Sequence, residues 1–519
     1  MKSLFTAVTC FAFSVSFAQE KAPENWPTLD PLKDKVYGVG SEEAYKTLAG
    51  KKGKKVIVAV IDSGVDTEHE DLKNVIWVNE DEIPNNGIDD DKNGYIDDVN
   101  GWSFLGGKEQ DINYEATEMA RIFQKGKRLY TTKDTLNLNG VDLKAFEDWK
   151  KIRITFNKEL AEQQKQLIGI GVFSDYLVNV KNKNNGKLDK EAIKNYTPAN
   201  EREEKIQKRM KLIFMMGIDV AELEAQLTEG KEMLEHNIHC NTMNMDSLRA
   251  VVVGDNPNDL TERYYGCNRV KGPDAFHGTH VSGIIAASRN NGIGMNGIAE
   301  NVVIMPVRAV PNGDERDKDI ANAIRYAVDN GATIINMSFG KYYSPDKKLV
   351  DDAVAYARSK DVLLIHAAGN ESKDNDVELS FPNRELLSGD TAKNWIQVGA
   401  SSFKAGKTLI GDFSNYGQKK VDVFAPGVDL YSTVPDNNAY KTSSGTSMAS
   451  PATAGAAAII RSYYPELKAE EVRTILMKSV VTYKKKVKIP GSKKKKKVKQ
   501  LCISGGFVNV NNAVKMLNK

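Results

Sequence analysis

Runs of consecutive apolar residues divide much of this chain into regular elements. The first run, residues 55–61 (KVIVAVI), is followed directly by Asp62. Short continuous apolar runs are typical of strands buried on both faces of a parallel sheet. The same pattern recurs at residues 302–307, 333–337, 362–366 and 396–398.

Segments with helical periodicity lie between these predicted strands. Residues 319–330 and 349–360 carry apolar side chains at the spacing of one helix face. This alternation predicts an α/β fold with a mostly parallel, doubly wound sheet. Functional residues in such folds gather at the carboxyl ends of the strands.

One block, residues 107–249, breaks the alternation because it is charged, favours helix and has few strand signals. Helices are predicted there at residues 113–130, 143–166, 201–216 and 219–235. The block is interpreted either as a functional element, such as a lid or docking module, or as a surface insertion without catalytic importance. The predicted organisation is a discontinuous domain, residues 19–106 and 250–519, interrupted by a long helical insertion.

The composition is that of an ordinary soluble globular protein. Hydrophobic residues make up 41% and charged residues 27% of the 519 positions, and the net charge is +3. So small a net charge gives no reason to expect a nucleic-acid partner. Two lysine clusters between residues 484 and 499 stand out. Such a run is usually a solvated loop, and an anionic partner is the alternative.

The first eighteen residues have the features of an export signal. Lys2 is followed by an apolar run over residues 4–17 and a small-x-small cleavage site that ends at Ala18. The alternative is a membrane anchor, but the run is short for spanning a bilayer. We expect residues 1–18 to be removed, leaving no transmembrane segment in a mature protein of the periplasm or extracellular space.

Three cysteines remain after the signal, namely Cys240, Cys267 and Cys502. Export permits a disulfide, and Cys240 with Cys267 is the pair we expect, although an odd count leaves at least one thiol unpaired. His236, His239 and Cys240 have helical spacing and could bind zinc together with Cys267. Surface histidines and a disulfide explain the same residues more simply.

Three short motifs carry candidate catalytic residues. The first offers an acidic side chain and the second a base. Asp62 ends the first predicted strand, where a carboxylate can hold a histidine in one tautomer. His277 opens an apolar run that is predicted to be a buried helix, and its pKa range suits a general base. A metal site at His277 and His280 is the alternative, but no Glu lies between them. His280 is better interpreted as a buried structural residue.

The third motif surrounds Ser447. It precedes a small, apolar stretch, residues 452–460, that is predicted to be a buried helix with Ser447 in its first turn. The positive end of the helix dipole favours negative charge there. Pro451 is expected to remove no needed backbone donor so early in the helix.

Taken together and in this order, the segments DSGVD, HGTHVSG and SGTSMASP resemble the motifs of the subtilisin family of serine peptidases. The resemblance implies a three-layer α/β/α fold. It also implies a secreted serine endopeptidase with Asp62, His277 and Ser447 as catalytic triad. Its partners would be polypeptide substrates, hydrolysed through an acyl-enzyme.

The resemblance extends to the segments that would hold the substrate. Asn370, in the segment AAGN, is similar to the family's oxyanion-hole residue and would donate its side-chain amide. The segments around residues 338 and 310–313 resemble the two strands that flank a bound peptide. The substrate-binding residues implied are Ser338, Phe339, Gly340, Ala367 and Gly369.

The acidic loop over residues 86–98 resembles a calcium site. Its oxygen-bearing side chains alternate in the manner of an EF-hand loop, and Gly94 permits the sharp turn. The expected ligands are Asp89, Asp91, Asn93, Asp97 and Asp98. A solvated acidic loop is the alternative. A second calcium loop, residues 290–294 with Asp71, is also similar to one found in the family.

Two features depart from the family pattern. The chain between Ala18 and the first strand is too short for the usual propeptide domain. The spacing between Asp62 and His277 is several times the usual length, because the helical block lies between them. We therefore hypothesise that this block assists folding or gates the cleft. A peptide-binding or scaffold protein that acts mainly through the helical block is the alternative function.

Overall fold

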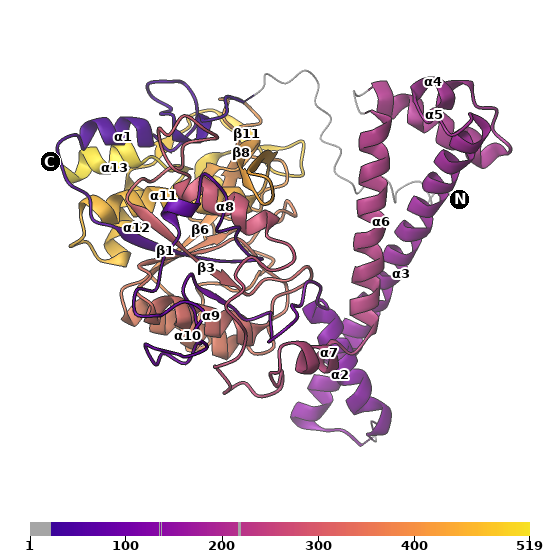
Figure 1. The fold of residues 1–519 in the computed structure, drawn as a ribbon, viewed down its shortest axis with the longest axis horizontal. Coiled ribbons are helices and arrows are strands. Elements are labelled where there is room, and N and C mark those ends of the chain that lie inside the picture. Colours follow the sequence, from indigo (N-terminus) through magenta and orange to yellow (C-terminus); the bar gives the residue numbers. More distant parts are fainter. Residues whose placement is uncertain (1–21, 134, 136, 216–218) are drawn as a thin grey trace. The chain divides into compact units, whose positions relative to one another are not determined.

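The structure is a computed structural model that describes residues 22–133, 135, 137–215 and 219–519. The expected export signal, residues 1–18, lies outside the described residues. The chain forms two compact units. The helical unit comprises Tyr114–Met245, and the sheet unit comprises Ala22–Asn113 and Asp246–Lys519 (Figure 1). Within the described residues, no helix is long and apolar enough to cross a membrane.

The sheet unit is built on a nine-stranded sheet with the order β10-β13-β7-β6-β5-β4-β1-β3-β2. The interior strand β1 pairs in parallel with β3 on one side and β4 on the other, and β10 is antiparallel to β13. The predicted α/β class and mostly parallel, doubly wound sheet are therefore confirmed. The strands are β1 (Val56–Asp62), β2 (Trp102–Ser103), β3 (Val302–Arg308), β4 (Ile334–Met337), β5 (Leu363–Ala367), β6 (Trp395–Ser401), β7 (Val423–Pro426), β10 (Val481–Thr482) and β13 (Gly506–Phe507).

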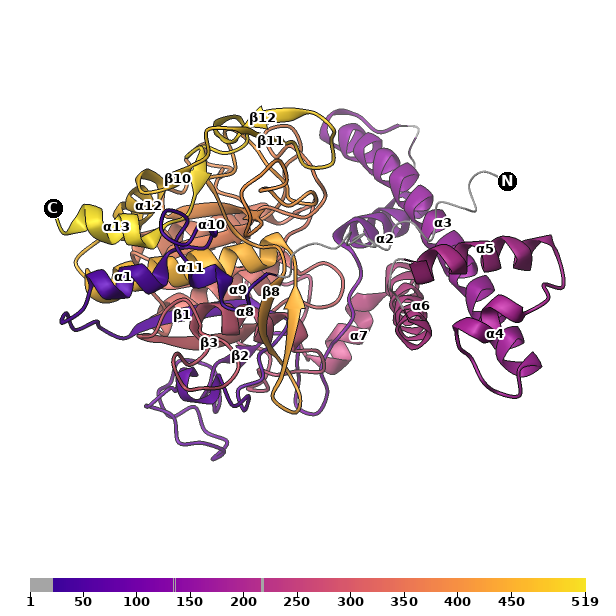
Figure 2. The same cartoon turned by 90° about the horizontal axis from the view of Figure 1, so that it is seen from above.

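Two further strand pairs lie outside this sheet, and both are antiparallel hairpins. The first pairs β8 (Leu430–Val434) with β9 (Ala439–Ser443). The second pairs β11 (Lys486–Lys488) with β12 (Lys495–Lys497) and falls within the lysine clusters (Figure 2).

Helices cover both faces of the sheet, as Figure 1 shows. On one face, α8 and α11 pack with Val58 and Val60 of β1, and on the other, α9 and α10 pack with Ala59 and Ile61. Alternate residues of one strand thus serve two cores, which explains why β1 is a continuous apolar run. The helices of this unit are α1 (Ser41–Thr47), α7 (Met245–Val252, starting at the unit boundary), α8 (Phe276–Ala286), α9 (Asp317–Asp329), α10 (Lys347–Ser359), α11 (Thr446–Tyr463), α12 (Ala469–Lys478) and α13 (Val510–Leu517), with short 3-10 turns at Trp26–Thr28, Lys73–Val75 and Val498–Gln500.

The helical unit has a core of its own. Its helices are α2 (Glu118–Thr132), α3 (Gly140–Lys183), α4 (Lys190–Asn195), α5 (Glu201–Met215) and α6 (Val220–Thr242). The long helix α3 packs along α6, and buried side chains such as Tyr176, Val180 and Met210 join α3 to α5. Phe123 of α2 stacks on Phe156 of α3 with ring centroids 4.3 Å apart.

A cluster of buried charges joins the two segments of the sheet unit that flank the inserted helical unit. Arg249 of α7 is fully buried and donates to both carboxylate oxygens of Asp319, at 2.7 and 2.9 Å. It also donates to Asp255 at 2.8 Å and to the backbone carbonyl of Phe104 at 3.2 Å. The segments that precede and follow the helical unit are therefore fixed to each other within the sheet unit.

The expected disulfide is absent. Cys240, Cys267 and Cys502 are all free, buried thiols, so the prediction that Cys240 pairs with Cys267 was wrong. Cys240 belongs to the helical unit and Cys267 to the sheet unit, a division that their closeness in sequence does not reveal. Burial raises the pKa of each thiol, to about 11 for Cys240 and Cys502, which keeps them protonated.

Candidate active site

Asp62 and His277 meet although they lie 215 positions apart in the sequence. Asp62 is the last residue of β1, and His277 is the second residue of α8. The Asp62 Oδ1 and His277 Nδ1 atoms are 2.7 Å apart. Gly278 permits this approach, because a Cβ atom there would lie 2.1 Å from the carbonyl oxygen of Gly64. A carboxylate thus fixes the tautomer and orientation of the imidazole.

The environment of His277 makes its ring more basic. Withdrawal from water lowers the pKa of His277, whereas the charge and hydrogen bond of Asp62 and the charge of Asp274 raise it, and the net result is a raised pKa. The side chain is still 36% exposed, so its outer edge can reach a solvent-facing reactant. His280, one helical turn further on, is fully buried, and its pKa is lowered to about 4. It lies 3.1 Å from two backbone carbonyls, as expected of a structural residue.

Ser447 lies in the first turn of α11, and its hydroxyl donates to the backbone carbonyl of Ser338 at 3.0 Å. Pro451, four residues later, has no N–H, so the Ser447 carbonyl lacks its helical donor. The Ser338 hydroxyl replaces that donor at 2.9 Å. The prediction that Pro451 removes no needed donor was therefore wrong, because Pro451 is the sixth residue of α11 and lies beyond its first turn.

A buried amide connects this turn to the sheet. Asn336 of β4 is fully buried, and its Nδ2 donates to the Ser338 hydroxyl at 3.0 Å. Its Oδ1 accepts a hydrogen bond from the Ser450 hydroxyl at 2.8 Å. Because both ends of one amide are engaged, the end of β4 and the start of α11 are held together, and with them the position of Ser447.

Asn370 follows β5, and its side-chain oxygen accepts hydrogen bonds from the N–H and hydroxyl of Thr446, at 2.8 and 3.0 Å. This leaves Nδ2 as a donor. A Cβ atom built on Gly445 would lie 3.6 Å from Asn370 Nδ2 and 3.6 Å from the backbone N of Ser447. Two N–H donors thus border one space, an arrangement that can stabilise an oxyanion.

A cavity of about 230 Å³ lies beside Ser447 and Asn370. The five residues that the sequence implied for substrate binding, Ser338, Phe339, Gly340, Ala367 and Gly369, all line it. Further lining residues that sequence reasoning missed are Lys341, Tyr342, His366, Ala368, Glu371, Ser380 and Thr446. Glu371 follows Asn370 directly, which could have indicated it. Its Oε2 accepts hydrogen bonds from Tyr342 and Asn415 at 2.8 and 2.9 Å.

The model of the subtilase family (peptidase S8) matches residues 53–500. The chain belongs to the subtilase family. This subtilase is 36% identical to the cell wall-associated protease of Bacillus subtilis (strain 168) over 236 residues. These residues make up 45% of this chain and 24% of that protein. It is 43% identical over 187 residues to the thermophilic serine proteinase of Bacillus sp. (strain AK1), covering 36% of this chain and 42% of that protein.

A shorter relative is covered more fully. Subtilisin DY of Bacillus licheniformis is 36% identical over 202 residues, which cover 38% of this subtilase and 68% of that protein. Among solved structures, one titled as proteases from Pseudoalteromonas arctica PAMC 21717 aligns with a TM-score of 0.50 and 18% identity, covering 95% of this chain and 97% of that one. At that identity the likeness supports the fold alone.

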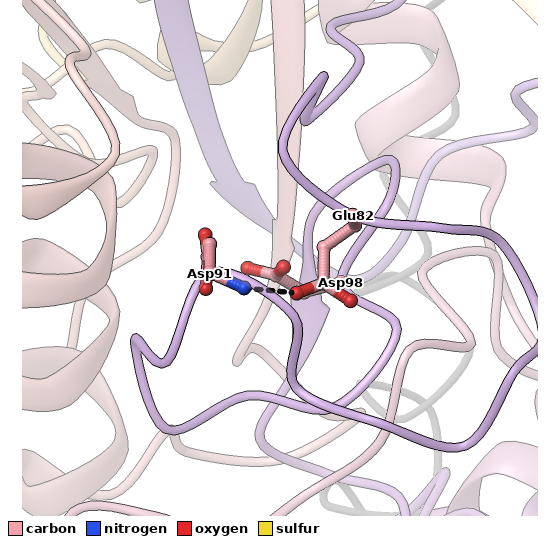
Figure 3. A group of neighbouring side chains, drawn as sticks. All are labelled: Glu82, Asp91 and Asp98. Carbon is pink, nitrogen blue, oxygen red and sulfur yellow. Dashed lines mark hydrogen bonds between the residues drawn. The ribbon is translucent and has the colours of Figure 1, made fainter.

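The acidic loop of this subtilase brings three carboxylates together, those of Glu82, Asp91 and Asp98 (Figure 3). One oxygen of each lies within 4.8 Å of the others. Burial raises the pKa of Asp98 to about 6, so its charge is costly in this surrounding. A set of converging carboxylate oxygens suits calcium, and the residues present therefore fit that ion.

The expected ligands divide between two roles. Asp91 and Asp98 belong to the converging group, and Glu82, which precedes the loop and which the sequence did not indicate, is its third member. The other three shape the loop. Asp89 accepts backbone N–H bonds from Asn93 and Gly94, Asp97 accepts those of Asn86 and Gly87, and Asn93 donates to Asp91 and Asp98.

The other metal predictions have different outcomes. Asp71 accepts a hydrogen bond from Asn291 Nδ2 at 2.6 Å, so the second predicted loop does contact its carboxylate. Within the helical unit, the described residues His236, His239 and Cys240 do not by themselves form a cluster of potential metal ligands, and the zinc alternative stays a prediction. His236 instead stacks on Tyr114, with ring centroids 4.1 Å apart.

Proposed function

We propose that this subtilase is a serine endopeptidase in which Asp62, His277 and Ser447 form the catalytic triad. The observation that carries the proposal is the 2.7 Å hydrogen bond between Asp62 and His277. It joins the carboxyl end of β1 to the start of α8, as a general base with its orienting carboxylate requires. The names of the relatives, which are proteases, support the same reaction.

The proposed reaction is acyl transfer. The Ser447 hydroxyl turns from the Ser338 carbonyl toward His277, loses its proton to the imidazole and attacks the scissile carbonyl carbon. Asp62 stabilises the imidazolium that forms. The imidazolium then protonates the departing amine, which breaks the peptide bond and leaves an ester on Ser447. Water, deprotonated by His277, hydrolyses that ester.

The negative charge on the carbonyl oxygen is proposed to be held by Asn370 Nδ2 and the backbone N–H of Ser447. Both donors border the space in front of Gly445, and the contacts of Asn370 with Thr446 fix its amide before the reaction. Donors that need no reorganisation lower the barrier most effectively. The start of α11 adds the positive end of a helix dipole at the same place.

The substrate is proposed to bind as an extended peptide along residues 338–340, by main-chain pairing of the kind seen in β-augmentation. The side chain next to the scissile bond would enter the cavity of about 230 Å³. Residues 310–313 would flank the peptide on the other side. Specificity for that side chain would then depend on the lining residues, which include Ala367, Gly369 and Glu371.

Calcium and export complete the proposal. Glu82, Asp91 and Asp98 would hold a structural calcium ion, which neutralises three carboxylates that otherwise repel each other. Residues 1–18 would direct the chain to the periplasm or the extracellular space. Protein substrates would then be met outside the cytoplasm.

The test is active-site labelling with a fluorophosphonate probe, which reacts with activated serine hydroxyls. We expect the wild type to be labelled, Ser447→Ala to be unlabelled and Asp62→Asn to be labelled far more slowly. Ser444→Ala is the matched control, because its hydroxyl bonds to Asp429 instead. A folded wild type that is not labelled, or a Ser447→Ala variant that still is, would refute the triad.

A further inference from the structure

The segment over residues 484–499 is the most strongly charged part of the chain. It contains ten lysines and no other charged residue, whereas the whole chain has a net charge of only +3. Without this segment the chain would therefore carry a net charge of −7. Eight of the ten lysines are exposed and two are partly buried. The segment is a cationic island on an otherwise acidic protein, and we call it the lysine hairpin.

The hairpin places like charges opposite each other. Lys486 pairs with Lys497 and Lys488 with Lys495 across β11 and β12. Like charges in directly opposed positions destabilise a strand pair. In the part of the chain that the structure describes, none of the ten lysines forms an ion pair. The fold does not use these charges, and it has to overcome their repulsion.

The underside of the hairpin shares an apolar cluster with a residue that lines the proposed substrate cavity. Val487 is fully buried, and with Ile489 it belongs to the same apolar cluster as Ala368, which lines the cavity. Figure 2 shows both strands of the hairpin on the surface of the sheet unit. The lysines thus lie on an element whose buried side belongs to the apolar cluster that includes Ala368.

The turn of the hairpin also touches the loop that carries Asn370. Gly491 N–H and the Ser372 hydroxyl donate to the same carbonyl, that of Asp412, at 3.0 and 2.7 Å. Ser372 is two residues after Asn370. Gly491 has φ +65°, and a Cβ atom there would lie 2.7 Å from that of Ser372, so the turn lies directly against the Ser372 side chain. A peptide that leaves the cavity on this side would pass the lysines within a few residues, at about 3.3 Å per residue.

We propose that the lysine hairpin binds acidic segments of polypeptide substrates, a few residues from the cleaved bond. This inference rests on the proposed peptidase function and names the substrate class. An acidic segment would be repelled by the net negative charge of the rest of the protein, and the hairpin reverses that field beside the cavity. Its position at the cavity, rather than at a remote face, favours a substrate over an anionic membrane or glycan.

The test compares three fluorogenic peptides with one shared scissile sequence, flanked by four glutamates on either the amino or the carboxyl side, or by four glutamines. The hairpin lies on one side of the cavity, so only one of the two glutamate peptides should bring its glutamates to the lysines. For the wild type at low salt, we expect kcat/KM for that peptide to exceed kcat/KM for the glutamine peptide about tenfold. The difference should lie mainly in KM. It should shrink at about 1 M salt, where the Debye length falls to about 3 Å.

Two triple variants with the same change in net charge separate the hairpin from general charge effects. The hairpin variant is Lys493→Gln, Lys494→Gln, Lys495→Gln. The control variant is Lys52→Gln, Lys54→Gln, Lys55→Gln, whose exposed lysines precede β1 at the opposite end of the strands from the cavity. The hairpin variant should lose most of the preference and still cleave the glutamine peptide at the wild-type rate. The control variant should keep the preference.

Equal cleavage of all three peptides by the wild type would overturn the inference and leave the peptidase proposal intact. If both triple variants lost the preference for the glutamate peptide to the same extent, the inference would be overturned, because the net charge of the protein and not the hairpin would explain the preference. Hairpin-dependent binding to phosphatidylglycerol vesicles without any peptide preference would overturn it in favour of a membrane surface. If the wild type cleaves no peptide and resists the fluorophosphonate probe, the peptidase proposal fails, and the inference fails with it.

Discussion

Removing the Ser338 hydroxyl tests directly how the proposed nucleophile Ser447 is held in place. This hydroxyl donates to the Ser447 carbonyl, which Pro451 deprives of a helical donor, and accepts from the buried Asn336 amide. Ser338→Ala leaves both groups without these partners. A buried polar group that loses its hydrogen bond costs about 1–3 kcal/mol. Because the Ser447 carbonyl is only part-buried, we expect a total loss of about 2–4 kcal/mol.

The assay is urea unfolding in the Ser447→Ala background, which removes the proposed nucleophile and with it any self-digestion. Ser282→Ala is the matched control, since Ser282 is also buried but donates to the Gly278 carbonyl within α8. That carbonyl keeps its helical N–H partner, so the control should lose less than about 1 kcal/mol. The slope of the transition should stay constant, so that the midpoints report stability.

Comparable midpoints for the two serine variants would refute the reasoning, because they would mean that the Ser447 carbonyl and Asn336 find other partners at no cost. A second readout uses Ser338→Ala with Ser447 intact. Loss of the contact should loosen the first turn of α11, and labelling by the fluorophosphonate probe should become slower. Ser282→Ala should be labelled at the wild-type rate.

The other predictions concern the oxyanion donor, the general base and the metal loop. Asn370→Asp keeps an acceptor for Thr446 but removes the donor, so kcat should fall about 10²–10³-fold with little change in KM; an unchanged kcat would exclude the donor role. Asp274 raises the pKa of His277, and a general base must be neutral, so Asp274→Asn should move the acid limb of kcat/KM to lower pH; a shift to higher pH would contradict the assignment. Calcium at about 100 times its Kd should raise the free energy of unfolding of the wild type by about 2.7 kcal/mol relative to EGTA. Calcium should not raise that of Asp91→Asn, whereas the exposed control Asp81→Asn should respond like the wild type.

Local patterns predicted the fold well because the information lies in neighbouring residues. The run that ends at Asp62 predicted β1 to within one residue, and the helix that contains Ser447 was predicted from its small apolar residues. Contacts between distant segments were not predictable in this way. Glu82 enters the acidic group only through the folding of its loop, and the role of Ser338 toward Ser447 requires β4 and α11 to be adjacent.

The position of β1 between two strands that follow it in the sequence has a consequence for the order of events during synthesis on the ribosome. Both of its neighbours, β3 and β4, are made later, after the whole helical unit has emerged. At about 5–20 residues per second, β1 waits on the order of tens of seconds without a partner, as an apolar strand open to aggregation. The helical unit is rich in local contacts and can fold during that interval. The proposed catalytic triad forms later still, because Ser447 cannot join Asp62 and His277 until α11 has left the exit tunnel.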